Sequence, residues 1–392
     1  MTFPLEGVRV LDLGQIYNGP YAGFLLAMAG ADVIKVEPPT GDKLRGPKGK
    51  TPMAFAMLNS NKRSIAIDLK SEGGQALFKS LVPQVDVVLE NFAPGVMDKL
   101  GIGYKVLKSL HPQLIYASGS GYGLTGPSKD QLAMDHTIQA VSGMMSVTGF
   151  EDGPPLRAGG APIDILGGTH LYAGIATAIA RKALHGEGGL VEVSMLESMY
   201  FVFSSDFTAF HATGKLPERK GNRSPAGVVP YSVYPCSDGY IALIVVAEHH
   251  WERLCELIGR SDLLRDPDMS TRAGRLKREG ELNDIIGAWT AKRTRQEAFD
   301  AMREARLPIA PVRDLDELRN DPHLIERGMV EWREHPDMGR IALANSPLRF
   351  PDAGMQDIRF FPELGEHTDA VLEELLGLDA RAIEELRATE IC

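Results

Sequence analysis

The sequence has few of the residues that mark secreted, metal-binding or membrane-spanning proteins. Its 392 residues include three cysteines, Cys236, Cys255 and Cys392. This odd and widely spaced set provides neither a disulfide framework nor a zinc site. The first residues show no basic region followed by an apolar run, and the apolar stretches at 21–31 and 241–247 are short for a bilayer. We therefore expect a cytoplasmic protein with no targeting segment, no structural metal and no membrane partner.

Basic residues are also scarce. The chain has 42 Lys and Arg against 52 Asp and Glu, which gives a formal net charge of -10. Because a nucleic-acid backbone needs a broad basic face, this balance argues against nucleic acid as a partner. Local basic spots remain at Lys43, at 45–50 and at Lys62 and Arg63. They are either solvated surface charge or contacts to the phosphates of a small ligand.

Several catalytic motifs are missing. The chain contains neither the G-x-S-x-G elbow of α/β-hydrolases nor the H-E-x-x-H spacing of zinc proteases. Residues 121–126 fit G-x-G-x-x-G, but Pro127 follows where a dinucleotide-binding fold would open a helix. We interpret this segment as a flexible glycine loop. Cys236 lies beside a hairpin turn, and a small buried apolar residue is a simpler interpretation than a reactive thiol.

What the sequence does contain is an alternation of apolar strands and helices. Strands are predicted at 8–13, 32–36, 64–69, 85–90, 114–118 and 190–195. Helices are predicted at 21–31, at 71–81 with Ser71 as N-cap, from 94 and at 168–184. Continuous apolar strands separated by helices indicate a parallel sheet that is covered on both faces, an α/β fold.

The second half of the chain has a different pattern of residues. Residues 213–230 are rich in Gly, Pro and charge, which indicates a domain crossing. Residues 231–247 alternate around the turn Ser237-Asp238-Gly239, the pattern of a β-hairpin. Helices are predicted at 251–258, 281–289 and 296–306, and a terminal helix pair at 368–376 and 380–388. These segments suggest a smaller α+β domain followed by a return to α/β structure.

The stretch 142–168 contains the most informative carboxylate, Asp164. It is the last acidic residue before the helix expected from Gly168, so an N-cap is one interpretation. A plain cap does not require the flanking pairs Gly159-Gly160 and Gly167-Gly168. Glycines permit backbone to approach a bulky ligand, so a functional role for Asp164 is the second interpretation.

Six longer strings carry a resemblance that runs along the whole chain. They are GVRVLDLG near the start, GADVIKVEPP at 30–39, LNSNKRSIAIDLK at 58–70, ENFAPGVMDKLG at 90–101, QAVSGMMSVTGFEDGPP at 139–155 and LGEHTDAVLEELLG at 364–377. In this order they resemble class III CoA-transferases, the family that includes formyl-CoA transferase, carnitine CoA-transferase and the α-methylacyl-CoA racemases.

The resemblance implies both a fold and a reaction. It implies a Rossmann-like large domain built from 1–212 and 328–392, a small central α+β domain at 213–327, and an interlocked homodimer. It also implies an acyl-CoA:carboxylate CoA-transferase without a permanently bound cofactor, in which coenzyme A and its esters are substrates. Asp164 would be the nucleophile and would form an aspartyl anhydride and then an aspartyl-CoA thioester.

The resemblance also assigns binding residues by position. Contacts to CoA are implied for Tyr17, Asn18, Ile67, Asp68, Leu69, Lys70, Asn91, Phe92, Lys99, Met134 and Asp135. Arg223 is a candidate for holding the acceptor carboxylate, with Gly227 near it.

Four departures from the family pattern bear on specificity. The racemases carry a histidine where Met134 stands, and proton transfer at an α-carbon needs two flanking bases. The formyl-CoA transferases have a polyglycine loop where this chain has 224–227, glutamine at Tyr17 and a basic residue at Pro38. We therefore expect CoA transfer without an oxalate-specific role. A racemase, a CoA-dependent dehydratase partner on the same scaffold and a non-catalytic CoA-ester binding protein remain as alternatives, and the donor and acceptor acids stay open.

Overall fold

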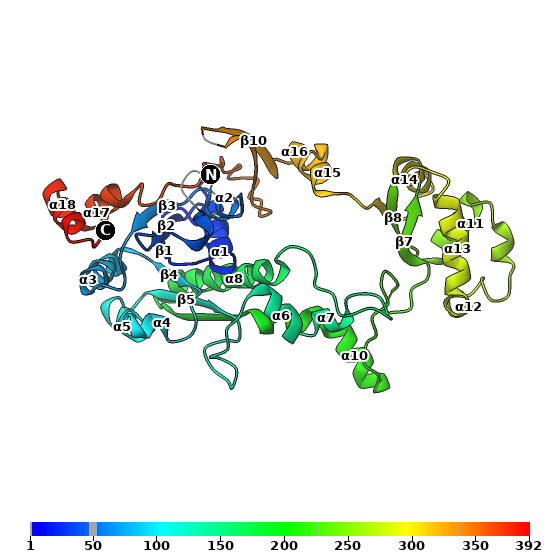
Figure 1. Ribbon diagram of the computed structural model, residues 1–392, viewed down its shortest axis with the longest axis horizontal. Coiled ribbons are helices and arrows are strands. Elements are labelled where there is room, and N and C mark those ends of the chain that lie inside the picture. The colour runs from blue at the N-terminus through cyan, green and yellow to red at the C-terminus, as the bar shows by residue number, and fades with distance from the viewer. Residues whose placement is uncertain (1, 47–52, 225, 337) are drawn as a thin grey trace. The chain divides into compact units, whose positions relative to one another are not determined.

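The computed structural model describes residues 2–46, 53–224, 226–336 and 338–392, and it divides into two compact units (Figure 1). The large unit comprises Met1–Ser142, Ala158–Ser205 and Asp321–Cys392; the small unit comprises Gly143–Arg157 and Asp206–Asn320. Both ends of the chain belong to the large unit. The segment Gly143–Arg157 groups with the small unit, whereas our boundaries assigned it to the large domain.

A six-stranded parallel sheet forms the centre of the large unit, in the order β3-β2-β1-β4-β5-β6. Its strands are β1 (Arg9–Asp12), β2 (Asp32–Glu37), β3 (Arg63–Ala66), β4 (Val87–Glu90), β5 (Ile115–Ser120) and β6 (Gly189–Ser194). Each overlaps a predicted strand, and the parallel α/β architecture is confirmed. The strand order reverses between β1 and β4, and α/β sheets bind ligands at the carboxyl ends of the strands beside such a reversal.

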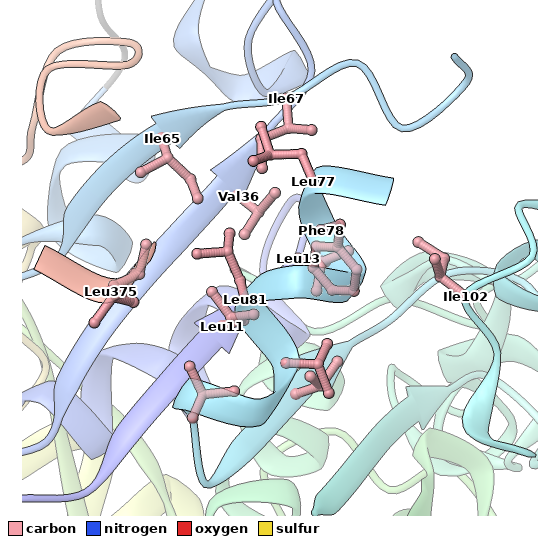
Figure 2. Close-up of a cluster of buried hydrophobic side chains, with 14 of the residues drawn as sticks. Leu11, Leu13, Val36, Ile65, Ile67, Leu77, Phe78, Leu81, Ile102 and Leu375 are labelled. Atoms are coloured by element: carbon pink, nitrogen blue, oxygen red, sulfur yellow. The ribbon is translucent and has the colours of Figure 1, made fainter. Parts of the chain in front are cut away.

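Alternate residues of each strand enter two separate cores. Leu11 of β1 packs with helices α3 (Glu72–Leu81), α5 (Tyr104–Leu110) and α17 (Thr368–Leu376) on one face (Figure 2). Val10 packs with α1 (Asn18–Met28) and α8 (Pro162–His185) on the other. Because both faces are covered, every strand position can be apolar, which explains the uninterrupted apolar runs.

Two helices begin earlier in the chain than predicted. Helix α1 starts at Asn18 rather than 21, and α8 starts at Pro162 rather than 168. Pro20 and Pro162 lie in the first turns of these helices, where a missing N–H costs no intrahelical bond. The Ser71 cap of α3 is as predicted, since its side chain accepts the Gly74 N–H.

Helix α8 is longer and more apolar than the sequence analysis recognised. By length and mean hydropathy alone it could cross a membrane, with a third of its most apolar window buried. Its inner residues Leu171 and Ile175 are fully buried in the core shared with α1 and the sheet.

The small unit is built on an antiparallel sheet of β7 (Tyr231–Cys236), β8 (Gly239–Ile244) and β9 (Ile309–Pro311). The predicted hairpin turn joins β7 to β8. Its core includes Trp251 and Ile286. The helices are α7 (Met144–Val147), α10 (Ser204–Thr213, which starts in the large unit), α11 (Glu248–Leu257), α12 (Arg272–Lys277), α13 (Glu279–Thr290), α14 (Arg295–Glu304) and α15 (Leu315–Arg319).

The remaining elements complete the large unit. They are α2 (Met53–Asn59), α4 (Val96–Lys99), α6 (Asp135–Val141), α9 (Met195–Tyr200), α16 (Pro322–Glu326), the antiparallel pair β10 (Val330–His335) and β11 (Gly339–Ala344), and α18 (Ala380–Ala388).

Candidate active site

A cavity of about 250 Å³ lies where β1, β4 and β5 end. Its walls come from the three segments that follow these strands, from the loop before α6 and from the first turn of α8. The lining includes Gln15, Ile16, Tyr17, Asn18, Lys43, Asn91, Phe92, Gly119, Ser120, Gly121, Lys129, Leu132, Met134, Asp164 and Met195. The cavity therefore occupies the position that the strand order favours for a ligand.

Asn91 fixes the turn between β1 and α1 that forms one wall. Its Oδ1 accepts the Gln15 N–H at 2.7 Å, and its Nδ2 donates to the Gln15 carbonyl at 2.9 Å. The next residue, Ile16, has φ of +66°, an unfavourable conformation for a β-branched side chain. Strained backbone of this kind is concentrated at functional sites. Asn91 thus supports the cavity wall through both ends of its amide.

A buried ion pair stands behind the same turn. The Lys62 ammonium contacts Asp12 at 2.8 Å, with both side chains fully buried, and it also donates to the Pro20 carbonyl. Burial lowers the pKa of Lys62 to about 8, against the opposing effect of Asp12. A side chain at Gly23 would collide with Asp12, so glycine is required there for α1 to pack so close.

The other basic residues singled out by the sequence are also paired. Lys35 contacts Asp42 at 3.1 Å inside the protein, and Arg45 forms a two-pronged contact with Glu37 at 2.6 Å. Arg63 pairs with Glu374 at 2.7 Å. Arg45, Lys62 and Arg63 are therefore engaged by carboxylates, and contact of these residues with ligand phosphates stays a prediction. Lys43 is exposed and lines the cavity, while Lys48 and Lys50 lie outside the described residues.

Asp164 lies inside the first turn of α8, not ahead of it. Ala161 occupies the N-cap position, so the capping interpretation of Asp164 is wrong. Its side chain lines the cavity, although only 8% of the residue is exposed. Side chains at Gly167 and Gly168 would strike Asn18 within 2.6 Å. These two glycines therefore allow α1 and α8 to pack closely, and their proximity to a ligand stays a prediction.

A second carboxylate, Asp135, caps α8 from outside the helix. Its Oδ2 accepts the Ile163 N–H at 2.8 Å and the Asp164 N–H at 3.1 Å. Pro162 has no N–H, so these are the first two donors of the helix. Burial, reinforced by the charge of Asp135, raises the pKa of Asp164 to about 7. Asp164 therefore titrates near neutral pH despite the favourable helix end.

The structure gathers only part of the predicted CoA-binding set around the cavity. Tyr17, Asn18, Asn91, Phe92 and Met134 line it together with Asp164. The cavity lining does not include Ile67, Asp68, Leu69, Lys70 or Lys99. Ile67 is buried in the hydrophobic core (Figure 2). Lys99 is exposed at the end of α4. Contact with CoA at these positions stays a prediction.

Two further residues predicted for the acceptor belong to the small unit. The Arg223 guanidinium lies 3.3 Å from Glu151 and 3.7 Å from Glu279. Gly227 adopts φ of +66°, and its carbonyl accepts a bond from Arg272. Arg223 is therefore already engaged by carboxylates of its own unit.

The structure bears on two other motifs: it agrees with the loop interpretation of 121–126, but it leaves Cys236 only partly buried, where a buried residue was expected. The glycines at 121–126 form a loop, and the next helix begins only at Asp135. Gly121 packs against Ala133 so closely that a side chain would overlap it. Burial raises the pKa of the Cys236 thiol, which disfavours the nucleophilic thiolate.

Sequence reasoning assigned no role to four further residues. Gln15 and Ile16 lie next to predicted contacts and could have been found from that position. Glu90 is buried beside a second cavity of about 330 Å³, and burial raises its pKa to about 7. Gln139 is fully buried and bonded to Asp135. Glu90 and Gln139 each open one of the strings that carry the resemblance. The strings do not show what these side chains contact, because pairing and burial depend on the fold.

Comparison with known proteins identifies the family. Residues 5–368 match the family model described as CoA-transferase family III. A succinyl-CoA–D-citramalate CoA-transferase from Chloroflexus aurantiacus is 36% identical, covering 99% of this chain and 98% of that protein. An acetyl-CoA:oxalate CoA-transferase from Acetobacter aceti is 37% identical, covering 96% and 97%.

The fold comparison gives the same answer. A crystal structure of a CAIB/BAIF family protein from Brucella suis superposes with a TM-score of 0.87 at 33% identity, over 96% of this chain and all of that one. The family model and the curated relatives each cover nearly the whole chain. The protein therefore belongs to CoA-transferase family III and is a class III CoA-transferase.

Proposed function

We propose that the protein transfers CoA from an acyl-CoA to a free carboxylic acid, with Asp164 as the covalent nucleophile. One observation carries this proposal: a buried carboxyl lines the cavity at the sheet's carboxyl edge, and within the described residues no cation pairs with it. The buried Asp12 carboxylate, in contrast, is paired with the Lys62 ammonium. Asp164 is instead left free to react.

The first half of the reaction would proceed in two attacks. An ionised Asp164 oxygen adds to the thioester carbonyl, the C–S bond breaks, and CoA leaves as the thiolate, so that an acyl-aspartyl anhydride remains. The thiolate then attacks the aspartyl carbonyl carbon. This step expels the donor acid as its carboxylate and leaves CoA bound to Asp164 as a thioester.

The second half reverses these steps with the acceptor. Its carboxylate attacks the aspartyl-CoA carbonyl, which expels the thiolate and forms a new anhydride. The thiolate then attacks the acceptor's acyl carbon, and the product acyl-CoA leaves with Asp164 regenerated. Burial and the neighbouring Asp135 both disfavour the resting charge of Asp164. Covalent attachment removes that charge, so the same environment favours the intermediates.

The racemase alternative receives less support. Met134 stands where the racemases carry a histidine, and His136 is exposed on α6. An acid-base pair needs two groups flanking the α-carbon. The cavity lining contains Asp164 but no histidine among its described residues.

Trapping the covalent intermediate tests the proposal. The protein is incubated with acetyl-, succinyl- or formyl-CoA, quenched with hydroxylamine and digested for mass spectrometry. We expect an Asp164 hydroxamate in the wild type and none in Asp164→Asn. The matched control, Asp352→Asn, changes an exposed aspartate and should label normally. Turnover that survives Asp164→Asn would refute the mechanism, and CoA-ester binding without any label would favour the non-catalytic alternative.

We also infer a cytoplasmic homodimer with interlocked chains. Large apolar side chains of the large unit remain exposed, notably Phe201 at 82%, Leu184 at 77% and Tyr200 at 61%. The rings of Tyr200 and Phe201 are in contact, and exposed apolar groups that adjoin in this way are typical of association surfaces. Sedimentation of the purified protein tests this inference, because a monomer at micromolar concentration would contradict it.

A further inference from the structure

A buried hydrogen-bond chain connects α6 with the beginning of α8. Gln139 is fully buried on α6, one turn after Asp135. Its Nε2 donates to Asp135 Oδ1 at 2.6 Å, and its Oε1 accepts the Ala158 N–H at 2.8 Å. Asp135 then accepts the N–H groups of Ile163 and Asp164. One side chain thus ties together Asp135 and the segment that leads into the first turn of α8.

The direction of these bonds is determined by the backbone. The Ala158 N–H can only donate, so the carbonyl oxygen of Gln139 must face it. The amide NH₂ is then directed at Asp135 Oδ1, while two backbone donors occupy Oδ2. Both oxygens of the Asp135 carboxyl group therefore accept hydrogen bonds, which fixes the orientation of this side chain at the helix end.

We propose that Gln139 is a positioning residue for CoA transfer: through its bonds to Asp135 and to the Ala158 N–H, it holds the Asp135 carboxyl group against the first two N–H donors of α8 and so fixes the turn that carries Asp164. This inference rests on the proposed function. Gln139 touches no reacting atom and acts through Asp135. Without its NH₂, Asp135 is free to rotate away from the helix end.

The surrounding charges leave Asp164 as the main electrostatic neighbour. Helix α6 packs against α8 and α9. On these three helices, His136, His170 and Glu197 are further titratable residues, and all three are exposed. Arg157, which directly precedes Ala158, is exposed as well. Their charges are screened by solvent, whereas Asp135 acts on Asp164 inside the protein.

Two substitutions of Gln139 test the proposal through the pH dependence of enzyme-CoA thioester formation. In Gln139→Glu, the new carboxyl can accept from Ala158 but can donate to Asp135 only while protonated. Two carboxylates at this distance share a proton and lose it as the pH rises. We expect near wild-type rates around pH 6 and, between about pH 7 and 9, a descending limb of roughly 10-fold that the wild type lacks.

Gln139→Leu removes the donor at every pH. We expect thioester formation to fall roughly 10- to 100-fold across the pH range, since small misplacements of a reacting group have effects of this size. The KM for acyl-CoA should stay within about two-fold, because the residue does not line the cavity.

The matched control is Gln296→Glu. Gln296 makes the same one-turn bond to an aspartate, Asp300, on the exposed helix α14. This variant should keep the wild-type pH profile. The proposal is overturned if Gln139→Glu also keeps that profile, or if Gln139→Leu keeps the wild-type rate. A role in folding alone would lower the rate without adding a limb. If the wild type itself forms no thioester, the proposed function fails, which is a distinguishable result.

Discussion

Two groups of charges, one largely buried and one of buried Asp164 with partly buried Asp135, lie at the same edge of the sheet, and they are built in opposite ways. Behind the β1–α1 turn, Asp12 is matched by Lys62, Asp42 by Lys35 and Glu37 by Arg45. At the start of α8, the neighbouring carboxyl groups of Asp135 and Asp164 are of the same charge type and do not neutralise each other. The matched group keeps its charges because each one has a counter-charge and further donors.

The carboxyl pKa shifts in opposite directions in the two groups. Although burial acts to raise the pKa of Glu37, the Arg45 and Lys35 charges hold it below its usual range. In Asp164 nothing opposes burial, and Asp135 adds to it, so the pKa rises to about 7. The comparison teaches that an unbalanced buried charge, rather than a buried charge as such, indicates a reactive site here.

Breaking the matched group should have the largest effect on stability. Lys62→Met leaves Asp12 buried without its partner, so we expect a loss of about 3–5 kcal/mol in the free energy of unfolding, measured by urea denaturation. Adding Asp12→Asn should recover much of this loss, because the orphaned charge is gone. Arg381→Met, which breaks an exposed pair with Glu385, should leave stability unchanged. Equal effects of Lys62→Met and Arg381→Met would refute the contrast.

Removing the unmatched charge should have the opposite sign. The pKa of Asp164 is higher in the folded chain than in the unfolded one, so the folded state binds the proton more tightly, and stability falls as pH rises from about 4 to about 7. Asp164→Asn cannot ionise and should be more stable than the wild type by on the order of 3 kcal/mol at pH 8. At pH 4 the difference should nearly vanish. A difference independent of pH, measured by denaturation at both values, would contradict this interpretation.

The smallest expected effect comes from Asp135→Asn, which distinguishes the role of Asp135 from that of Asp164. Asp135→Asn removes the charge that adds to burial at Asp164, so the pKa of Asp164 should fall by roughly one unit. The ionised nucleophile would then be populated at lower pH. In single-turnover measurements we expect the ascending limb of thioester formation to move toward acid by about that amount. An unmoved limb would mean that Asp135 acts on the helix end and not on the charge of Asp164.

The sequence predicted the large-scale fold well because the signal for it is local. Six apolar runs became six parallel strands, and the terminal helices begin and end where the pattern indicated. It failed at helix starts, since Asn18 and Pro162 enter their helices through contacts with distant residues. The ion pairs of the basic residues could not be predicted for a related reason, because their carboxylate partners, such as Asp12 and Glu374, are far away along the chain.

The sequence by itself determined the α/β class, the family and Asp164 as the candidate nucleophile. Apolar periodicity and the six strings that resemble the family can be recognised from the order of the amino acids alone. Only the tertiary structure decided what surrounds Asp164. It placed this carboxyl within the first turn of α8, brought Asp135 onto the N–H groups of that turn and buried Gln139 behind both. Burial and the distance between charges set a pKa, and both arise only when segments remote in sequence pack together.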